Sequence, residues 1–342
     1  MPELRQNLAT KEWVIISTER AKRPEEFAKK KESPLALPSY DPACPFCEGN
    51  ESQTPEEILG YRKEGTKAGQ KGWQVRVVPN KFPALVPSAA SAVGVQRSKS
   101  GIYLRMDGVG KHEVIVENPD HGKTLGTMSV AEVEKVIRAY HERYLVLDWD
   151  PAYRLIIIFR NQGSLAGASL LHPHSQLVAT AIVPSHVRNR IYEAQRYYDE
   201  LGRCVFCDMI KNEIEEKERI ILQNEKFIAF VPYAASVPYE IWILPKRHEA
   251  SLADLQPDDV SNLAQVLQKI LAKLYHSLNN PDYNYCINSL PHYSYSGPYY
   301  HWHIQILPRL TTRAGFEIGS GININVALPE ESAKFLREFV AK

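Results

Sequence analysis

The stretch that decides the fold is His172-Pro-His174-Ser-Gln176, because it returns further along the chain as His301-Trp-His303-Ile-Gln305. In each case a Cys-x-x-Cys pair and a lone histidine come first, in the same order. The preceding residues are Cys44, Cys47 and His121 in the first copy, and Cys204, Cys207 and His248 in the second. A match of this length indicates two copies of one domain. Two cysteines and two histidines in each copy make a potential zinc site.

The segments between these residues also align. His112–His121 corresponds to Tyr239–His248, and Asn80–Ala84 corresponds to Glu225–Ala229. We therefore predict two tandem domains, residues 1–195 and 196–342. Each is expected to be an antiparallel sheet with packed helices, which places the chain in the α+β class.

Hydrophobic periodicity locates individual elements. Ser129 and Glu132 form a capping box ahead of apolar residues at helical spacing. Further patterns predict strands at 12–17, 73–78, 113–116 and 154–159, and helices at 129–144, about 184–201 and about 257–276. We expect loops at 29–43 and at 87–110, the latter an insertion of the first copy, and a turn at Asn161-Gln-Gly163.

The bulk composition excludes some classes of protein. Lys plus Arg number 41 and Asp plus Glu 40 in 342 residues, which argues against a protein that coats nucleic acid. No apolar run approaches the length of a membrane span, and the start is no secretory signal. Four of the five cysteines form the two Cys-x-x-Cys pairs, which suits metal ligation in a reducing cytoplasm. A redox role for these pairs is the alternative.

The spacing of the repeated motif has a physical meaning. Residues two apart in a strand face the same side, so His172, His174 and Gln176 form one row of polar side chains. Such a row on a half-buried strand is costly without partners. A zinc ion can bind the first histidine, and a phosphate can bind the second histidine and the glutamine amide. The alternative is a surface strand that happens to carry histidines.

These residues together resemble the galactose-1-phosphate uridylyltransferases, a nucleotidyltransferase branch of the histidine triad superfamily. The resemblance runs from Lys11-Glu-Trp-Val to Gly315-Phe-Glu317. Its most specific pieces are Arg20-Ala-Lys-Arg-Pro24, Asn161-Gln-Gly163 with Gly167-Ala-Ser169, and the first histidine motif. The resemblance implies that the middle histidine attacks the α-phosphorus of UDP-glucose. Glucose 1-phosphate then leaves, and galactose 1-phosphate accepts the uridylyl group.

The resemblance assigns the nucleophile to His174. A neutral imidazole near pH 7 is nucleophilic without a separate base, and two successive transfers predict ping-pong kinetics. By the same resemblance Gln176 binds the non-bridging phosphoryl oxygens. The other contacts that it implies are Arg20 and Arg23 with the diphosphate and nucleotide, Asn80, Asn161, Gly167 and Ser169 with the nucleotide, and Glu317 with sugar hydroxyls. Solvated charges beside a proline turn are the alternative for the two arginines. In the second copy we expect His303 and Gln305 to face substrate phosphate or sugar.

We predict zinc on Cys44, Cys47, His121 and His172. Four protein ligands leave no open position, so this metal would brace the strand that aims His174. The repeat predicts a second site on Cys204, Cys207, His248 and His301. Bacterial relatives have instead an iron-type site of one glutamate and three histidines. His292, His301 and His303 are candidate matches, but the glutamate position falls near Arg190. One or two zinc ions per chain are expected, with iron as the alternative at the second site.

Several residues leave the substrate open. Ser175 and the Cys204–Cys207 pair resemble an ADP-glucose phosphorylase, and Lys81 stands where bacterial uridylyltransferases often have an aspartate. A nucleotidyl phosphorylase that uses inorganic phosphate is therefore an alternative. A zinc-braced nucleotide-binding protein without turnover is a further alternative. The His-Pro-His form and Gly315-Phe-Glu317 favour the hexose transferase. The expected partners are UDP-glucose, UDP-galactose and hexose 1-phosphates, with no nucleic acid or membrane. The resemblance also implies a cytoplasmic homodimer of carbohydrate metabolism.

Overall fold

The computed structural model describes residues 1–17, 37–87, 97–292 and 297–340. Arg20 and Arg23 lie outside the described residues, so their contacts with a nucleotide stay predictions. No helix in the described part of the chain combines the length and apolar character that a membrane crossing needs.

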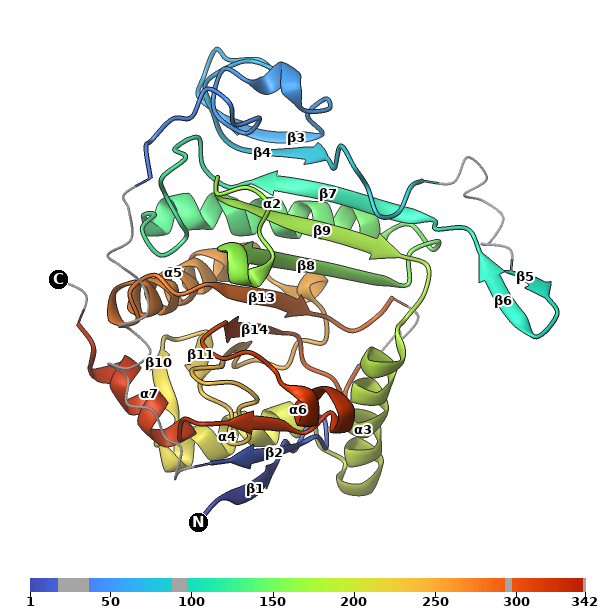
Figure 1. The fold of residues 1–342 in the computed structure, drawn as a ribbon, viewed down its shortest axis with the longest axis vertical. Helices are drawn as coiled ribbons and strands as arrows, with labels where there is room; N and C mark the ends of the chain where they lie inside the picture. The colour runs from blue at the N-terminus through green and yellow to red at the C-terminus, as the bar shows by residue number, and fades with distance from the viewer. Residues whose placement is uncertain (18–36, 88–96, 293–296, 341–342) are drawn as a thin grey trace.

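The described residues form a ten-stranded antiparallel sheet to which both copies contribute (Figure 1). The two half-sheets meet where β8 pairs with β13, with Phe159 directly opposite Cys286. From one edge to the other the strands are β10 (Ile220–Gln223), β11 (Phe227–Phe230), β12 (Ile241–Pro245), β14 (His303–Pro308), β13 (Tyr283–Asn288), β8 (Leu155–Gln162), β9 (His174–Thr180), β7 (Gly110–Val116), β4 (Trp73–Pro79) and β3 (Leu59–Arg62). The predicted antiparallel sheets are therefore present, but they are joined edge to edge. The predicted domain boundary at residue 195 remains a prediction.

Two long helices lie side by side on one face of this sheet, namely α2 (Val130–Asp148) and α5 (Val260–Ser277) (Figure 1). The helix α2 begins at the predicted N-cap Ser129, whose hydroxyl accepts from the Glu132 amide while the Glu132 carboxylate accepts from the Ser129 amide. Alternate strand residues such as Ile115 and Leu177 are fully buried against these helices. This packing confirms the predicted α+β class and two of the predicted helices, and α3 (Ser185–Leu201) confirms the third.

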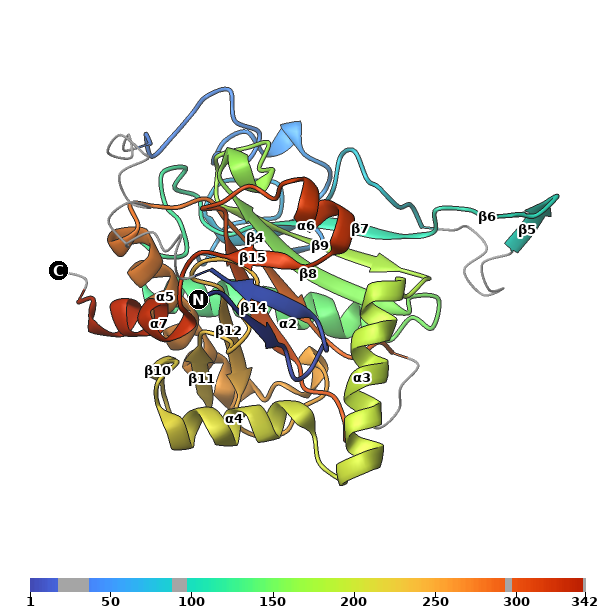
Figure 2. The same ribbon diagram turned by 60° about the horizontal axis from the view of Figure 1, so that its bottom comes forward.

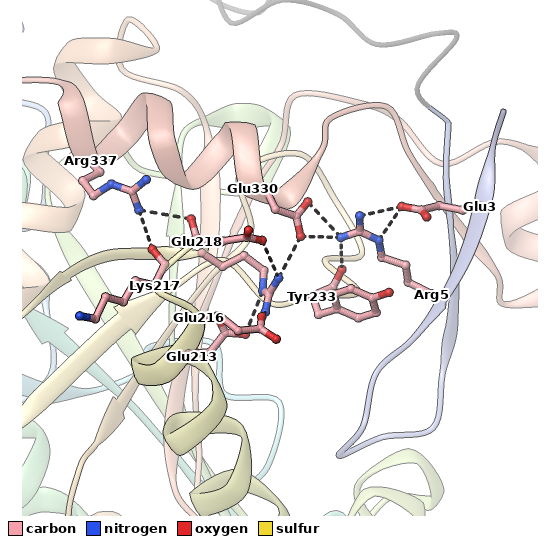
Figure 3. Close-up of polar contacts among 10 residues, drawn as sticks. Glu3, Arg5, Glu213, Glu216, Lys217, Glu218, Tyr233, Glu330 and Arg337 are labelled. Carbon is pink, nitrogen blue, oxygen red and sulfur yellow. Dashed lines mark hydrogen bonds and ion pairs between the residues drawn. The ribbon is translucent and has the colours of Figure 1, made fainter.

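The two ends of the described chain meet on the second half (Figure 2). Strand β2 (Trp13–Ile16) pairs with β1 (Glu3–Gln6) and, in parallel, with β15 (Asn323–Asn325). An ion-pair network extends this junction (Figure 3): Glu330 accepts hydrogen bonds from Arg5 at 2.8 Å and from Arg219 at 3.1 Å. The second half also contains α4 (Val205–Glu216), α6 (Gly315–Ser320), α7 (Pro329–Glu338) and the short turns η4 (Leu252–Asp254) and η5 (Pro257–Asp259).

Two local predictions are wrong. Residues 97–106, expected to be loop, form a hairpin of β5 (Arg97–Ser100) and β6 (Tyr103–Met106) that projects from the body (Figure 2). Gly101 at φ +61° provides the turn, since a left-handed conformation costs glycine little. Strand β8 also continues through Gln162, because the positive φ that ends it falls at Gly163. The short turns η2 (Glu51–Gln53) and η3 (Ser164–Ala166) complete the first half.

The sheet register corrects the alignment of the two copies. Gln176 lies directly opposite Val114, and Gln305 lies directly opposite Trp242. His112 of β7 therefore corresponds to Glu240, which directly precedes β12, Val114 corresponds to Trp242, and Val116 corresponds to Leu244. The sequence alignment with Tyr239 was out of register by one residue, because the connection to the lone histidine is one residue shorter in the second copy.

The alignment of Asn80–Ala84 with Glu225–Ala229 is also not reproduced in the sheet. On the side of β7 that does not pair with β9, the neighbouring strand is β4, where Val78 lies opposite Val114. On the side of β12 that does not pair with β14, the neighbouring strand is β11, where Phe230 lies opposite Trp242. Strand β4 thus holds the place of β11, and residues 80–84 follow this strand instead of forming it.

Candidate active site and metal clusters

A cavity of about 450 Å³ opens on the sheet face away from α2 and α5. Four of the predicted site residues line it: Asn80, Ser169, His174 and Gln176. Its remaining lining includes apolar side chains from the first Cys-x-x-Cys loop, β4, the segment after β4, β7 and the segment before β9, in this order Phe46, Val78, Phe82, Val114 and Leu170. Mostly apolar walls with a few convergent polar groups are typical of a site for a small organic ligand.

His174 is held in one tautomer. Its Nδ1 lies 2.8 Å from the carbonyl oxygen of His172, which can only accept, so Nδ1 carries the proton. The unprotonated Nε2 therefore carries the lone pair of the ring. Burial lowers the pKa of His174, which is 7 % exposed, so the ring stays neutral at pH 7. The ring of Phe46 packs against it with centroids 5.3 Å apart.

Gln176 lies two residues further on the same face. Its Oε1 is 2.7 Å from His112 Nε2 and 3.4 Å from Asn80 Nδ2. Both of these contacts with described residues are made by the amide oxygen of Gln176, and not by its amide nitrogen. The amide nitrogen is thus left as a donor beside the cavity, which is the group that a phosphoryl oxygen needs.

The first predicted metal set is brought together. The donor atoms of Cys44, Cys47, His121 and His172 all lie within 4.8 Å of one another. Cys47 Sγ is 3.4 Å from His121 Nδ1 and 3.6 Å from His172 Nδ1. These separations fit the edges of a zinc tetrahedron, roughly 3.5 Å from metal–ligand bonds of about 2.0 to 2.3 Å. His172 Nε2 donates to the Asn118 carbonyl at 2.8 Å, which leaves Nδ1 for the metal.

The second set repeats this arrangement with Cys204, Cys207, His248 and His301. Cys207 Sγ is 3.3 Å from His248 Nδ1 and 3.6 Å from His301 Nδ1, and His301 Nε2 donates to the Pro245 carbonyl at 2.8 Å. Both sets therefore suit a tetrahedral ion with sulfur and nitrogen ligands.

The alternative iron-type set is not assembled among the described residues. Neither cluster found there includes His292 or His303. His292 Nδ1 lies 3.3 Å from a carboxylate oxygen of Asp148 instead. Arg190, at the place of the expected glutamate, donates to Asn288 Oδ1 at 2.7 Å.

The polar row of the second copy has different surroundings. His303 is 0 % exposed, and its ring stacks on Trp242 with centroids 4.7 Å apart and an interplanar angle of 22°. This burial lowers the pKa of His303 to about 3. Gln305 donates through Nε2 to Glu240 Oε1 at 2.8 Å. The predicted contacts of His303 and Gln305 with substrate therefore gain no support from this packing.

The remaining predicted site residues lie around the cavity or further away. Asn161 Oδ1 accepts from Asn284 Nδ2 at 2.8 Å, and the same amide binds the Ala166 carbonyl of the short turn η3. Gly167 ends this turn at φ +84°, which brings the chain to Ser169 at the cavity wall. Both carboxylate oxygens of Glu317 accept backbone amides around α6, so this side chain has a structural role in the single chain.

Behind His174, the opposite side of β9 carries a buried polar network. Ser175 donates to Glu117, which forms an ion pair with Arg160 at 3.0 Å, and both charged groups are at most 1 % exposed. Tyr140 OH of α2 lies 2.5 Å from Tyr285 OH of β13 and 3.1 Å from Glu117. Ser175 therefore faces the helices and not the cavity, and the network ties the first copy to the second.

Two important residues were not identified from the sequence. Phe46 lies inside the repeated Cys-x-Phe-Cys motif, and that repetition was a signal that could have found it. His112 carries no comparable signal, because its partner Gln176 lies 64 positions away in the sequence.

Comparison with known proteins shows the family of the chain. The model of the galactose-1-phosphate uridyl transferase N-terminal domain matches residues 1–184, and that of the C-terminal domain matches residues 189–337. An ADP-glucose phosphorylase of Arabidopsis thaliana is 35 % identical over 98 % of this chain and 93 % of its own. A galactose-1-phosphate uridylyltransferase of Thermotoga maritima is 29 % identical over 99 % of this chain and 98 % of its own.

A solved structure extends the comparison to the fold. The crystal structure of an ADP-glucose phosphorylase from Arabidopsis thaliana with bound ADP-glucose has a TM-score of 0.83 and 33 % identity, with 100 % of each chain covered. Two domain models that together match nearly the whole chain, and a relative of 35 % identity, show the same family. The chain belongs to the galactose-1-phosphate uridyl transferase family.

Proposed function

We propose that this protein is a galactose-1-phosphate uridylyltransferase that works through a uridylyl-histidine. The observation that carries the proposal is the single tautomer of His174, whose Nε2 lone pair has no hydrogen-bond donor among the described residues and belongs to a ring that lines a cavity with a glutamine amide beside it. The family and the relatives named uridylyltransferase support the same reaction.

The reaction follows from these groups. His174 Nε2 attacks the α-phosphorus of UDP-glucose, a P–N bond forms, and the bond from phosphorus to the bridging oxygen breaks, so that glucose 1-phosphate leaves. The Gln176 amide donates to a non-bridging oxygen as charge develops there. A phosphate oxygen of galactose 1-phosphate then attacks the same phosphorus from the opposite side. UDP-galactose leaves, and the imidazole is neutral again.

The two metal clusters fit a bracing role in this scheme. Zinc would be held at Cys44, Cys47, His121 and His172, and a second ion at Cys204, Cys207, His248 and His301. Four protein ligands fill a tetrahedral site, so the ion supplies rigidity and no activated water. The chain's own contribution is to fix His172, whose carbonyl oxygen sets the tautomer of His174.

A second candidate is an ADP-glucose phosphorylase, which transfers an adenylyl group to inorganic phosphate through the same histidine. The likeness to the plant ADP-glucose phosphorylase favours it, in sequence and in fold. Ser175 is one of the residues that suggest this candidate in the sequence. Its hydroxyl lies beside Tyr140 of α2, so it faces the helices. Any effect of Ser175 on which nucleotide base is bound therefore acts through strand β9.

One experiment separates the candidates. The protein is incubated with UDP-glucose or ADP-glucose labelled in the α-phosphate, denatured, and analysed for a labelled histidine. A uridylyl adduct that is discharged by galactose 1-phosphate supports the proposal. An adenylyl adduct that is discharged by inorganic phosphate supports the second candidate. No adduct with either compound would leave a binding protein without turnover.

We also propose a homodimer in the cytoplasm with nucleotide sugars and hexose 1-phosphates as partners. The names of the family relatives support these substrate classes. Light scattering of the purified protein tests the dimer.

A further inference from the structure

His112 has hydrogen-bond contacts at both of its ring nitrogens. The backbone amide of Ala84 lies 3.1 Å from Nδ1 and points its hydrogen at it. The other nitrogen, Nε2, lies 2.7 Å from Gln176 Oε1 and 3.1 Å from Asn80 Nδ2. Because a backbone amide can only donate, Nδ1 is the acceptor and the ring proton is on Nε2. The Asn80 amide is also a donor, so it cannot bond this N–H and is left to bond the Gln176 oxygen.

This tautomer fixes the orientation of Gln176. The N–H of His112 requires an acceptor, so the glutamine must turn its oxygen toward the ring and its NH₂ group away from it. Asn80 Nδ2 at 3.4 Å supports the same oxygen. Reversing the amide would put two donors face to face and leave the reactive phosphate opposite an oxygen.

The second copy provides an internal comparison. Glu240 holds the place of His112, because both lie two residues before the residue opposite the glutamine of their strand pair. A carboxylate accepts only, and Gln305 accordingly presents Nε2 to it at 2.8 Å. Gln305 therefore points its amide nitrogen at Glu240, whereas Gln176 points its amide oxygen at His112. The partner of the glutamine is a carboxylate in the second copy and a neutral ring in the first.

We infer that His112 is a positioning residue of the transfer reaction. It holds the Gln176 amide as a donor toward the phosphoryl group, and the residue at this position distinguishes the reactive copy from the other. The inference rests on the proposed function, since it specifies how the same site recognises the α-phosphate.

The test compares three replacements that differ in hydrogen-bonding ability. His112→Gln keeps a donor near Nε2, His112→Phe keeps a ring without a donor, and His112→Glu introduces the acceptor of the second copy. We expect the rate of adduct formation to fall in the order wild type, Gln, Phe, Glu. The loss is within about 3-fold for Gln and reaches about 100-fold for Glu, the effect of removing one such donor. For the Phe variant kcat should fall by a larger factor than KM rises, because the amide contact with the phosphoryl group is made on binding and strengthens in the transition state.

Binding of UMP, measured by calorimetry, gives a readout that needs no turnover, and the same order is expected. Glu240→Gln is the matched control and should leave adduct formation unchanged. Unfolding temperatures of all variants exclude a loss of fold. Equal losses for the Gln and Glu variants, or a Phe variant as fast as wild type, would overturn the inference. Absence of an adduct in the wild type would instead refute the proposed function, and the UMP series would still decide the role of His112.

Discussion

Val114 and Trp242 hold the same place in the two half-sheets, each directly opposite the glutamine of its own copy. Val114 lines the cavity beside His174. Trp242 stacks on His303 and is 2 % exposed. The size of the side chain at this position therefore contributes to a difference between the two copies. His174 of the first copy lines a cavity, whereas His303 of the second copy is covered by an indole ring.

This relationship predicts that Val114→Trp closes the first copy. An indole at this position would occupy the space that the nucleotide needs, so UMP binding measured by calorimetry should weaken at least about 100-fold. Val114→Ile adds one methyl group and should bind within about 10-fold of wild type, because volume changes of this size are tolerated. Unaltered binding in the Trp variant, with its fold retained, would show that the ligand lies elsewhere.

His174→Ala should abolish the labelled adduct and reduce turnover by at least about 1,000-fold, since it removes the nucleophile. Intact mass spectrometry after incubation with the nucleotide sugar measures this. His186→Ala is the matched control, because His186 is an exposed residue of α3. A His174→Ala protein that still becomes labelled would place the chemistry at another residue.

Metal analysis should find two ions per chain. Cys44→Ser and Cys204→Ser should each lower the content by one, because each removes one ligand of one tetrahedron. The unfolding midpoint should fall on the order of 10 °C in each case, since metal binding stabilises the fold by several kcal/mol. Adduct formation should suffer more in Cys44→Ser, whose cluster contains His172. Metal content that is unchanged in both variants would exclude these ligands.

Glu213 should make the stability depend on pH. Burial raises its pKa to about 7 despite an Arg219 Nε at 2.9 Å, and its Oε2 has no hydrogen-bond partner among the described residues (Figure 3). A raised pKa means that the folded state binds the proton more tightly, so this contribution is full below pH 4.5 and is lost as the pH rises through 7. The contribution is roughly 3 kcal/mol at most.

The test is Glu213→Gln, which mimics the protonated form at all pH values. Relative to wild type, the variant should gain stability in urea unfolding between pH 5 and pH 8. Glu215→Gln, a replacement at an exposed position of the same helix, serves as the control. Parallel pH curves for wild type and Glu213→Gln would refute the assignment.

Arg160→Met should cost about 3 to 5 kcal/mol of unfolding free energy, because it leaves the buried Glu117 carboxylate without its cation. The double replacement with Glu117→Gln should recover part of this loss, since no buried charge then remains. Chemical denaturation of the three variants gives the coupling between the residues. Additive losses would show that the pair acts independently.

Both Cys-Cys-His-His clusters, and the placement of His174 and Gln176 on one face of a strand, were predictable, because a duplicated motif fixes residue types at short spacing along a strand. The helices α2, α3 and α5 were predictable from their periodicity and caps. The hairpin at 97–106 was missed, because its exposed strands carry no alternation of apolar residues.

By itself the sequence determined that two equivalent sheets would each carry a Cys-Cys-His-His set and a polar row. Only the tertiary structure decided that the sheets join at β8 and β13, that His112 faces Gln176, and that the second row packs against Trp242. The physical reason is register. Which side chains meet across a sheet depends on strand pairing between distant segments, and a shift of one residue changes every neighbour.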